Sequence, residues 1–298
     1  MDWTSKRVRT ILENALLEDK VAADVTTALT IERKLRATAT ICVNQACVIA
    51  GLGSIPVVLE LFAEITAKAG GTPPGRFTVI SHPEVFDGVR VKKGQPIAII
   101  RSNAAALLST ERVMLNVLQR MCGIATLTND FVKAVAGTKA RVIDTRKTVP
   151  GLRVLDKYAV STGGGTNHRL DLQDGILVTN NHIALGGGIT TTLENACRFR
   201  RGKQLIQIEV RSQAELDQAI AAGAESILLA NMSPTVVKKA VKQIRKALPT
   251  APIEAAGSVT LATVREYALT GVDFIGVGAL TYAAAAVDLT MKIAVDAS

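Results

Sequence analysis

The sequence predicts an α/β protein whose second half forms a parallel sheet. From Arg141 onward short apolar segments alternate with helical ones, and strands are predicted at residues 141–144, 175–178, 205–210, 226–229, 253–256 and 273–277. Helices are predicted between them at residues 212–222 and 234–248, and the apolar residues of the second helix share one face. Strands that alternate with helices form parallel sheets, and this many units in succession favour an α/β barrel.

The first part of the chain has a different pattern, typical of a small sheet packed on helices. Residues 5–18 and 55–69 have helical periodicity, and residues 109–135 predict one long helix or two abutting ones. Strands are predicted at residues 37–50, 77–80 and 89–100, the last with a turn at Lys93-Gly94. We therefore expect an open-faced α/β sandwich ahead of the barrel.

The chain is basic, with a net charge of +9 and an isoelectric point near 9.5. Nucleic acid is one explanation, but only 3% of the residues are aromatic, and neither an aromatic-studded basic strand nor a nucleic-acid-reading motif occurs. A generic basic surface accounts for part of the charge. An anionic small substrate accounts for it with few assumptions.

Cysteine usage and hydropathy bear on the compartment. The four cysteines form no Cys-x-x-Cys pair and no set with zinc-ligand spacing: Cys42, Cys47, Cys122 and Cys197. The N-terminal residues lack the apolar core of a signal peptide, and no apolar run reaches the roughly 18 residues of a membrane span. A cytoplasmic protein with reduced thiols and no membrane partner is expected.

The stretch from Asp144 to His182 carries the strongest functional signal. Its cations Arg146, Lys147 and Arg153 surround a Pro150-Gly151 turn, and a second polar cluster follows three glycines at residues 163–165. That cluster consists of Asn167, His168 and Arg169. Taken singly, such pieces are more often solvated faces and turns. Together they indicate a pocket for an anion.

The position of these polar groups supports a shared site. Cations begin where the apolar strand Val142-Ile143 ends, and Thr179 follows the strand of residues 176–178. Other strand ends carry Glu209, Ala230-Asn231, and the small residues 256–258 and 278–279. Carboxyl ends of parallel strands gather on one face of a barrel, where small residues let backbone N–H groups approach a phosphate. Close-packed turns are the alternative explanation for the small residues.

Three segments of this region, DTRKTVPGLRVLDKYAV, GGGTNHR and NNH, closely resemble quinolinate phosphoribosyltransferase, the carboxylating nicotinate-nucleotide pyrophosphorylase family. The similarity runs from the DVTT of residues 24–27 to the GALT of residues 278–281. The resemblance implies an N-terminal sandwich domain over residues 1–115, completed by residues 281–298. It also implies a complete or incomplete α/β barrel, of the type II phosphoribosyltransferase kind, over residues 116–280.

The resemblance also assigns roles to single residues. It implies that quinolinate is bound by Arg112, Thr145, Arg146, Lys147, His168, Arg169 and Thr179. It implies that phosphoribosyl pyrophosphate is bound by Glu209, Ala230, Ala256, Gly257, Ser258, Val277, Gly278 and Ala279. Lys147 and Glu209 are the implied catalytic residues, and Glu209 also faces Mg²⁺ indirectly. An arginine suits a dicarboxylate because its fork pairs bidentately with a carboxylate.

The implied reaction is decarboxylating phosphoribosyl transfer to quinolinate in the biosynthesis of NAD, with Mg²⁺ as cofactor. The implied assembly is a homodimer in which Arg112 reaches the neighbouring subunit's site, with a hexamer as a larger alternative.

Three positions depart from the family pattern. Thr179, Ala230 and Ala256 stand where the family usually has Lys, Asp and Ser. These changes remove a cation and an acceptor from the expected site. Two alternatives therefore stay open: a related phosphoribosyltransferase with a different acceptor, and a catalytically weakened paralogue that binds a ligand or a partner protein.

Overall fold

The structure is a computed structural model that describes residues 1–80 and 82–296. Contacts divide the chain into two units, one made of residues 1–127, 149–164 and 283–298, the other of residues 128–148 and 165–282. The sequence-based boundary at residue 115 falls instead within α4 (Ala104–Ala134), a single uninterrupted helix that runs through the division. A boundary inside a continuous helix leaves no break in periodicity to detect. Residues 149–164 also lie in the first unit rather than in the barrel.

The first unit is built on a four-stranded antiparallel sheet with strand order β12-β1-β5-β3. Its strands are β1 (Arg36–Val43), β3 (Thr78–Ile80), β5 (Pro96–Asn103) and β12 (Leu289–Val295). A two-stranded ladder joins β2 (Cys47–Val48) to β4 (Arg90–Val91). The predicted strand over residues 37–50 is thus two strands, interrupted at residues 44–46. The C-terminal strand β12 pairs with β1 and forms one edge of this sheet.

The first unit also contains helices, and those predicted at residues 5–18 and 55–69 are among them. They are α1 (Lys6–Glu18), the 3₁₀ turn η1 (Val21–Ala23), α2 (Val25–Thr30), α3 (Ser54–Lys68) and α5 (Arg153–Thr162). Val8, Leu12 and Leu16 are buried on one face of α1, which packs on α3. The N-cap of α2 is Asp24, whose carboxylate accepts hydrogen bonds from the backbone N–H and hydroxyl of Thr27. The DVTT segment is therefore a helix start.

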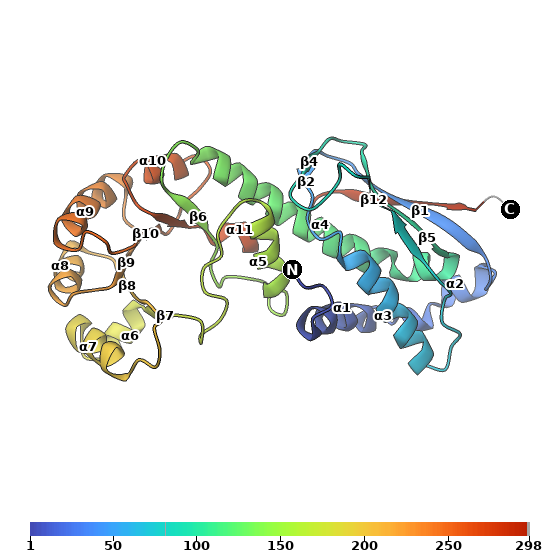
Figure 1. Cartoon of the computed structure of the whole chain (residues 1–298), viewed down its shortest axis with the longest axis horizontal. Coiled ribbons are helices and arrows are strands. Elements are labelled where there is room, and N and C mark those ends of the chain that lie inside the picture. Colours follow the sequence, from blue (N-terminus) through green and yellow to red (C-terminus); the bar gives the residue numbers. More distant parts are fainter. Residues whose placement is uncertain (81, 297–298) are drawn as a thin grey trace. The chain divides into compact units, whose positions relative to one another are not determined.

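The second unit is a six-stranded parallel sheet with strand order β6-β11-β10-β9-β8-β7. The strands are β6 (Arg141–Ile143), β7 (Ile176–Val178), β8 (Ile206–Val210), β9 (Ser226–Ala230), β10 (Ile253–Ala256) and β11 (Phe274–Gly276). The helices are α6 (Asn180–Leu185), α7 (Ile189–Phe199), α8 (Gln213–Ala221), α9 (Pro234–Ala247), α10 (Val264–Ala268) and α11 (Ala279–Tyr282). Figure 1 shows α8, α9 and α10 outside the curved row of strands.

This unit has the architecture of an incomplete barrel. Strands β6 and β7 are the two ends of the sheet, and on the outer side of β6 an isolated parallel bridge joins Ile143 to Thr166. Alternating side chains of β8, Ile206, Ile208 and Val210, are buried against the helix layer, which leaves Gln207 and Glu209 facing the interior. The prediction of a sandwich followed by a complete or incomplete α/β barrel is confirmed, and the second unit has the incomplete form.

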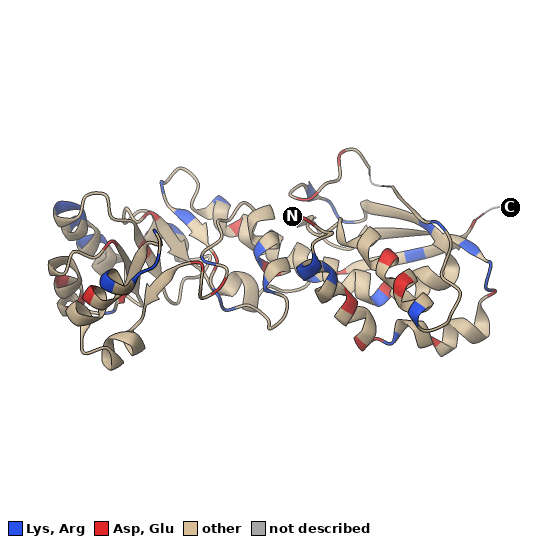
Figure 2. Cartoon of the chain, turned by 60° about the horizontal axis from the view of Figure 1, so that its bottom comes forward, with Lys and Arg blue, Asp and Glu red and all other residues tan. Residues whose placement is uncertain are grey.

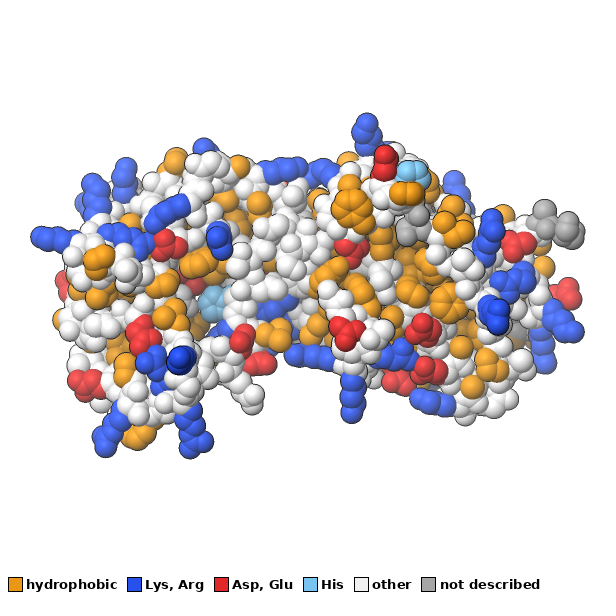
Figure 3. Space-filling model, viewed as in Figure 1, with side chains coloured by type: hydrophobic (Ala, Val, Ile, Leu, Met, Phe, Trp, Pro, Cys, Tyr) orange, Lys and Arg blue, Asp and Glu red, His pale blue; other side chains and the backbone are white. Residues whose placement is uncertain are grey.

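Charge is spread over both units. Lys and Arg residues occur on many helices and loops in the view of Figure 2, and they are not collected into a single band there. On the face drawn in Figure 3, acidic and hydrophobic side chains are interspersed with the basic ones. Among the described helices, none is both long enough and apolar enough to cross a membrane.

Candidate active site

Most of the residues implied by the resemblance lie at the carboxyl edge of the parallel sheet. The strand registers align Ala230 with Ala256, Ala256 with Gly276, and Gly276 with Ile143. On the other side, Val178 is level with Ile208, so Thr179 follows its strand beside Glu209. The carboxyl ends of these strands therefore lie at one edge of the sheet. The implied site residues at this edge are residues 145–147, Thr179, Glu209, Ala230, residues 256–258 and residues 277–279.

Two chain segments meet closely around Lys147. Its backbone N–H donates to the Thr145 hydroxyl at 3.0 Å, and its carbonyl accepts from the Thr281 hydroxyl at 2.9 Å. A Cβ at Gly278 would lie 3.0 Å from the Lys147 Cδ, so a side chain there would displace the lysine. Lys147 itself is exposed. Because Gly278 has no side chain, the side chain of Lys147 can lie over the end of β11.

A second close approach shapes the loop after β10. Gly257 has a φ of +127°, and a Cβ there would lie 2.5 Å from the Asn231 Oδ1. The Asn231 N–H donates to the Ala256 carbonyl at 2.8 Å, and Asn231 itself is in the left-handed region with a φ of +55°. Glycine is required at residue 257 for both conformation and space. The backbone is consequently the main surface offered to a ligand at residues 256–258.

Arg146 and Arg169 form the cationic part of the site. The Arg169 Nη1 donates to the Gly175 carbonyl at 2.7 Å. Burial lowers the pKa of Arg169, the nearby charge of Arg146 lowers it further, and Asp174 opposes them. The Nε of Arg146 is buried, and in the described part of the chain it has no hydrogen-bond partner. An unpaired buried donor beside a second guanidinium is the electrostatic signature of a site for an anion.

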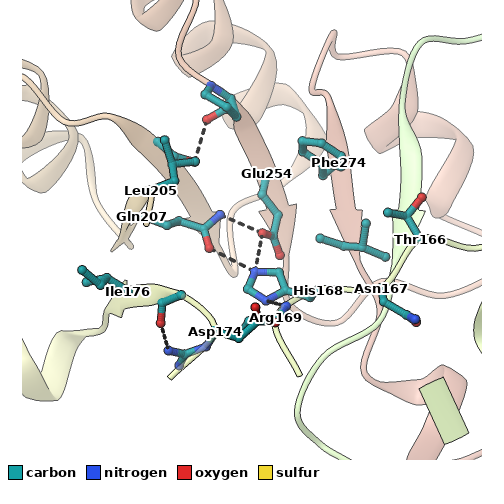
Figure 4. A pocket seen from close by; sticks show the side chains of 14 residues that line it. Thr166, Asn167, His168, Arg169, Asp174, Ile176, Leu205, Gln207, Glu254 and Phe274 are labelled. Carbon is teal, nitrogen blue, oxygen red and sulfur yellow. Dashed lines mark hydrogen bonds and ion pairs between the residues drawn. The ribbon is translucent and has the colours of Figure 1, made fainter. Parts of the chain in front are cut away.

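The side chain of His168 lines a cavity of about 390 Å³, whose wall includes residues of the parallel strands. Strand residues from the amino halves of β8 and β10 line it, among them Gln207 and Glu254 (Figure 4). The ring approaches Gln207 Oε1 at 3.2 Å and Glu254 Oε2 at 3.5 Å, and its Nδ1 accepts from the Arg169 N–H at 2.8 Å. The structure thus places the His168 ring among protein groups, while the Arg169 guanidinium is close enough to Arg146 for the two charges to interact.

The departures from the family pattern have their own contacts. Thr179 forms a capping box with His182 at the start of α6, and its hydroxyl lies 2.8 Å from the His182 Nδ1. Ala230 is buried at the end of β9. Glu209 is bound by Arg211, whose Nε and Nη2 lie 2.7 and 2.6 Å from its Oε1.

Arg112 is the one implied site residue outside this unit. It lies on α4 in the first unit and is exposed. Its role across a subunit interface stays a prediction, as do the individual ligand roles of the other residues.

Sequence reasoning missed the interior polar residues Gln207 and Glu254, and it missed Arg211. The signal was present, because Gln207 and Glu254 interrupt apolar strands at positions that alternate with buried aliphatic residues. Recognising it requires knowing which strand face points into the barrel. Arg211 looks like an ordinary loop cation until its contact with Glu209 is known.

Comparison with known proteins agrees with the two-unit architecture. Residues 24–122 match the family model for the quinolinate phosphoribosyl transferase N-terminal domain, and residues 124–292 match that for the C-terminal domain. The nicotinate-nucleotide pyrophosphorylase [carboxylating] of Mycobacterium leprae is 38% identical over 286 residues, which is 96% of each chain. A probable nicotinate-nucleotide pyrophosphorylase [carboxylating] of Bacillus subtilis is 41% identical over 70% of this chain and 71% of its own.

Among solved structures, NadC from Streptococcus pyogenes superposes with a TM-score of 0.89 at 32% identity, and the alignment covers 100% of both chains.

Proposed function

Because the chain belongs to the quinolinate phosphoribosyltransferase family, we propose that it joins quinolinate to the phosphoribosyl group of phosphoribosyl pyrophosphate with decarboxylation. The products are nicotinate mononucleotide, pyrophosphate and CO₂, a step in NAD biosynthesis. The chain is accordingly an enzyme, a phosphoribosyltransferase. One observation carries the acceptor assignment: Arg146, with its unpaired buried Nε, lies beside Arg169. A dicarboxylate supplies an acceptor for the unpaired Arg146 Nε and negative charge for both guanidinium groups.

The geometry suits the first step of this reaction. The quinolinate nitrogen forms a bond to C1 of the ribose while the bond from C1 to the pyrophosphate oxygen breaks, and pyrophosphate leaves with the electron pair. Lys147, placed over the end of β11 by Gly278, is the proposed cation for the negative charge that develops there. Fixed charges that need no reorganisation lower such a barrier.

Decarboxylation follows from the product of the first step. Once the ring nitrogen is alkylated, it is positive and withdraws electrons from the neighbouring C2. The bond between C2 and its carboxylate then breaks, CO₂ leaves, and C2 takes up a proton. We assign to Arg146 and Arg169 the task of holding the carboxylates of the ring, with Thr145, His168 and Thr179 nearby as the resemblance implies.

We propose that the backbone at two strand ends binds the 5′-phosphate of phosphoribosyl pyrophosphate. Residues 256–258 and 277–279 follow neighbouring strands β10 and β11, and both contain a glycine that a side chain would crowd. Backbone N–H groups at such small residues suit a phosphate oxygen. The departure at Ala256 removes a hydroxyl and leaves this backbone surface unchanged.

Mg²⁺ fits this site as a companion of phosphoribosyl pyrophosphate. Glu209 is the nearby carboxylate, and within the described residues no three His, Cys, Asp or Glu side chains cluster as a metal cage. Magnesium commonly uses one or two carboxylates and completes its shell with phosphates and water. When bound, it would neutralise the pyrophosphate charge. Glu209 would have to share its carboxylate between Arg211 and the metal or ribose hydroxyls.

The assembly and location are also proposed on the family assignment. Arg112 is exposed on α4, and we propose that it completes the site of a second copy in a homodimer. Charged soluble substrates support a cytoplasmic enzyme.

The test is a turnover assay with purified protein, phosphoribosyl pyrophosphate and Mg²⁺, in which nicotinate mononucleotide and pyrophosphate are separated and quantified. Quinolinate should give both products in equal amounts with one CO₂ each. Lys147→Ala should abolish most turnover, and Lys133→Ala, an exposed lysine on α4, is the matched control. Turnover with another pyridine or a different acceptor, but not with quinolinate, would favour the first alternative raised by Thr179 and Ala230. Binding without turnover would favour the second.

A further inference from the structure

The interior of the second unit contains a chain of polar side chains that ends at the site. Glu254 is 4% exposed, and its Oε2 accepts from the Gln207 amide at 2.8 Å. The Gln207 Oε1 in turn lies 3.2 Å from the Nε2 of His168. The three residues converge in the cavity drawn in Figure 4. A buried carboxylate is costly unless it is hydrogen-bonded, so its presence here calls for an explanation.

The contacts fix the tautomer of His168. The Arg169 N–H donates to the Nδ1 of His168 at 2.8 Å, so Nδ1 must be without a proton. The proton of the neutral ring is then on Nε2. That N–H faces two acceptors, Gln207 Oε1 at 3.2 Å and Glu254 Oε2 at 3.5 Å. Gln207 is oriented for this because its amide nitrogen is already held by Glu254.

The surrounding sequence makes room for this arrangement. A Cβ at Gly276 would lie 2.4 Å from the Glu254 Oε1, so the glycine of β11 leaves the space that the carboxylate occupies. The backbone N–H of His168 also donates to the Asp144 Oδ1 at 2.7 Å. Both the ring and the backbone of His168 are therefore anchored.

We propose that Glu254 and Gln207 are positioning residues for the anion site. They hold the His168 ring as the Nε2–H tautomer, in which Nδ1 carries no proton and accepts the hydrogen bond from the Arg169 N–H. The chain at Arg169 is thereby fixed, and its guanidinium is kept beside Arg146. This positioning role rests on the proposed function in one respect only, which is that the bound anion is quinolinate. The tautomer and the anchoring are properties of the protein alone.

The first test reads the tautomer directly. The chain has three histidines, so ¹⁵N-labelled imidazole spectra can be assigned with His82→Gln and His182→Gln variants. The His168 ring of the wild type should show a protonated Nε2 and an unprotonated Nδ1. In Glu254→Leu and Gln207→Leu this single tautomer should give way to a mixture. Glu254→Gln keeps an acceptor and should retain it, and Glu266→Gln on the exposed face of α10 is the control.

The second test reads the consequence at the site. Gln207→Leu and Glu254→Leu should weaken quinolinate binding by about tenfold or more, because small displacements of a binding group are costly. Binding of phosphoribosyl pyrophosphate should change less than twofold. If Glu254→Leu does not fold, Gln207→Leu provides the measurement.

The outcomes separate the two proposals. A single unchanged His168 tautomer in folded Gln207→Leu would overturn the positioning role. An equal loss of affinity for both substrates, in step with a lower melting temperature, would do the same by showing a merely structural effect. A wild type with the stated tautomer that fails to bind quinolinate would contradict the proposed function while leaving the tautomer assignment in place.

Discussion

The guanidinium groups of Arg146 and Arg169 lie near enough for the charge of one to lower the pKa of the other. Burial is the larger cause of the lowered Arg169 pKa, and Arg146 is the second. Proteins rarely place two cations together, one of them with a buried unpaired N–H, unless an anion relieves both. The folded chain therefore holds a strained electrostatic arrangement at the site proposed for quinolinate.

Arg146→Ala and Arg169→Ala should each weaken quinolinate binding about tenfold to a hundredfold, because a charge-assisted hydrogen bond contributes roughly 1.5–3 kcal/mol. Removing either arginine also relieves repulsion, which offsets the loss of the Arg169 hydrogen bond to the Gly175 carbonyl, so the melting temperature should change little. Isothermal titration calorimetry gives the dissociation constants. Arg198→Ala, an exposed arginine on α7, should leave them unchanged. Wild-type affinity in both site variants would reject the pocket.

Mixed dimers test the role of Arg112. If this arginine serves the neighbouring site, each single variant, Arg112→Ala or Arg146→Ala, should have strongly reduced activity as a homodimer when quinolinate is below saturation. When the two variant chains are combined, one site in each mixed dimer keeps both arginines, and activity should return in part. Native mass spectrometry establishes that subunits have exchanged. Mixtures that exchange fully and stay inactive would show that Arg112 acts within its own chain or has no catalytic role.

The double substitution Thr179→Lys with Ala230→Asp tests the departures from the family. Each lost interaction is worth about 1.5–3 kcal/mol in the transition state, so the natural chain should turn over slowly and the double variant should gain at least tenfold in kcat/KM. The structure adds a cost, because Thr179 caps α6 with His182, and losing such a cap destabilises by about 1 kcal/mol. The melting temperature should therefore fall as activity rises. A fast natural chain that the double variant slows would show a site rebuilt around Thr179 and Ala230.

The raised pKa of Tyr158 leads us to expect that the stability of the folded chain decreases at high pH. Burial, together with the hydrogen bond at 2.7 Å to Asp87, raises the pKa of Tyr158 to about 12. A raised pKa means that the folded state holds the phenolic proton more tightly than the unfolded state. This contribution is complete below the ordinary pKa of about 10 and is lost as the pH rises toward 12.

Denaturant unfolding of wild type and Tyr158→Phe should therefore differ most at pH 8 to 9, and the difference should shrink as the pH approaches 12. Tyr282→Phe, whose side chain is 62% exposed, controls for loss of a hydroxyl. A constant difference across this range would contradict the assignment.

The sequence was sufficient for elements whose periodicity is uninterrupted. The predicted helix at residues 5–18 is α1, and the predicted strands from residue 141 onward coincide closely with β6 to β11. The sequence was insufficient where tertiary contacts determine which unit a segment belongs to. Nothing local shows that α4 continues through the division between units, or that residues 149–164 leave the barrel for the first unit.

The candidate site shows the same limit. Strand ends identify the edge where Lys147, Glu209 and Ala256 gather, because parallel strands share a direction. Whether a given side chain reaches a ligand depends on neighbours from other strands. Glu254 of β10, which lies beside His168, is such a neighbour, and no spacing in the sequence connects the two. Arg211 follows Glu209 by two residues, and only the structure shows that their side chains are in contact.

The first unit is assembled from segments that lie far apart in the sequence, and this affects how the chain folds as it leaves the ribosome. Strand β1 needs β12 along one edge, and the contact between Thr38 and Asp296 spans 258 positions. The chain must be synthesised at least as far as β12, which begins at Leu289, before that edge is covered, and an uncovered edge recruits other chains. Nascent chains arrested before residue 289 should be cleaved by protease within residues 36–43, and chains released at full length should resist. Translation speed and chaperone access, rather than the strength of the finished sheet, would then set the yield of active protein.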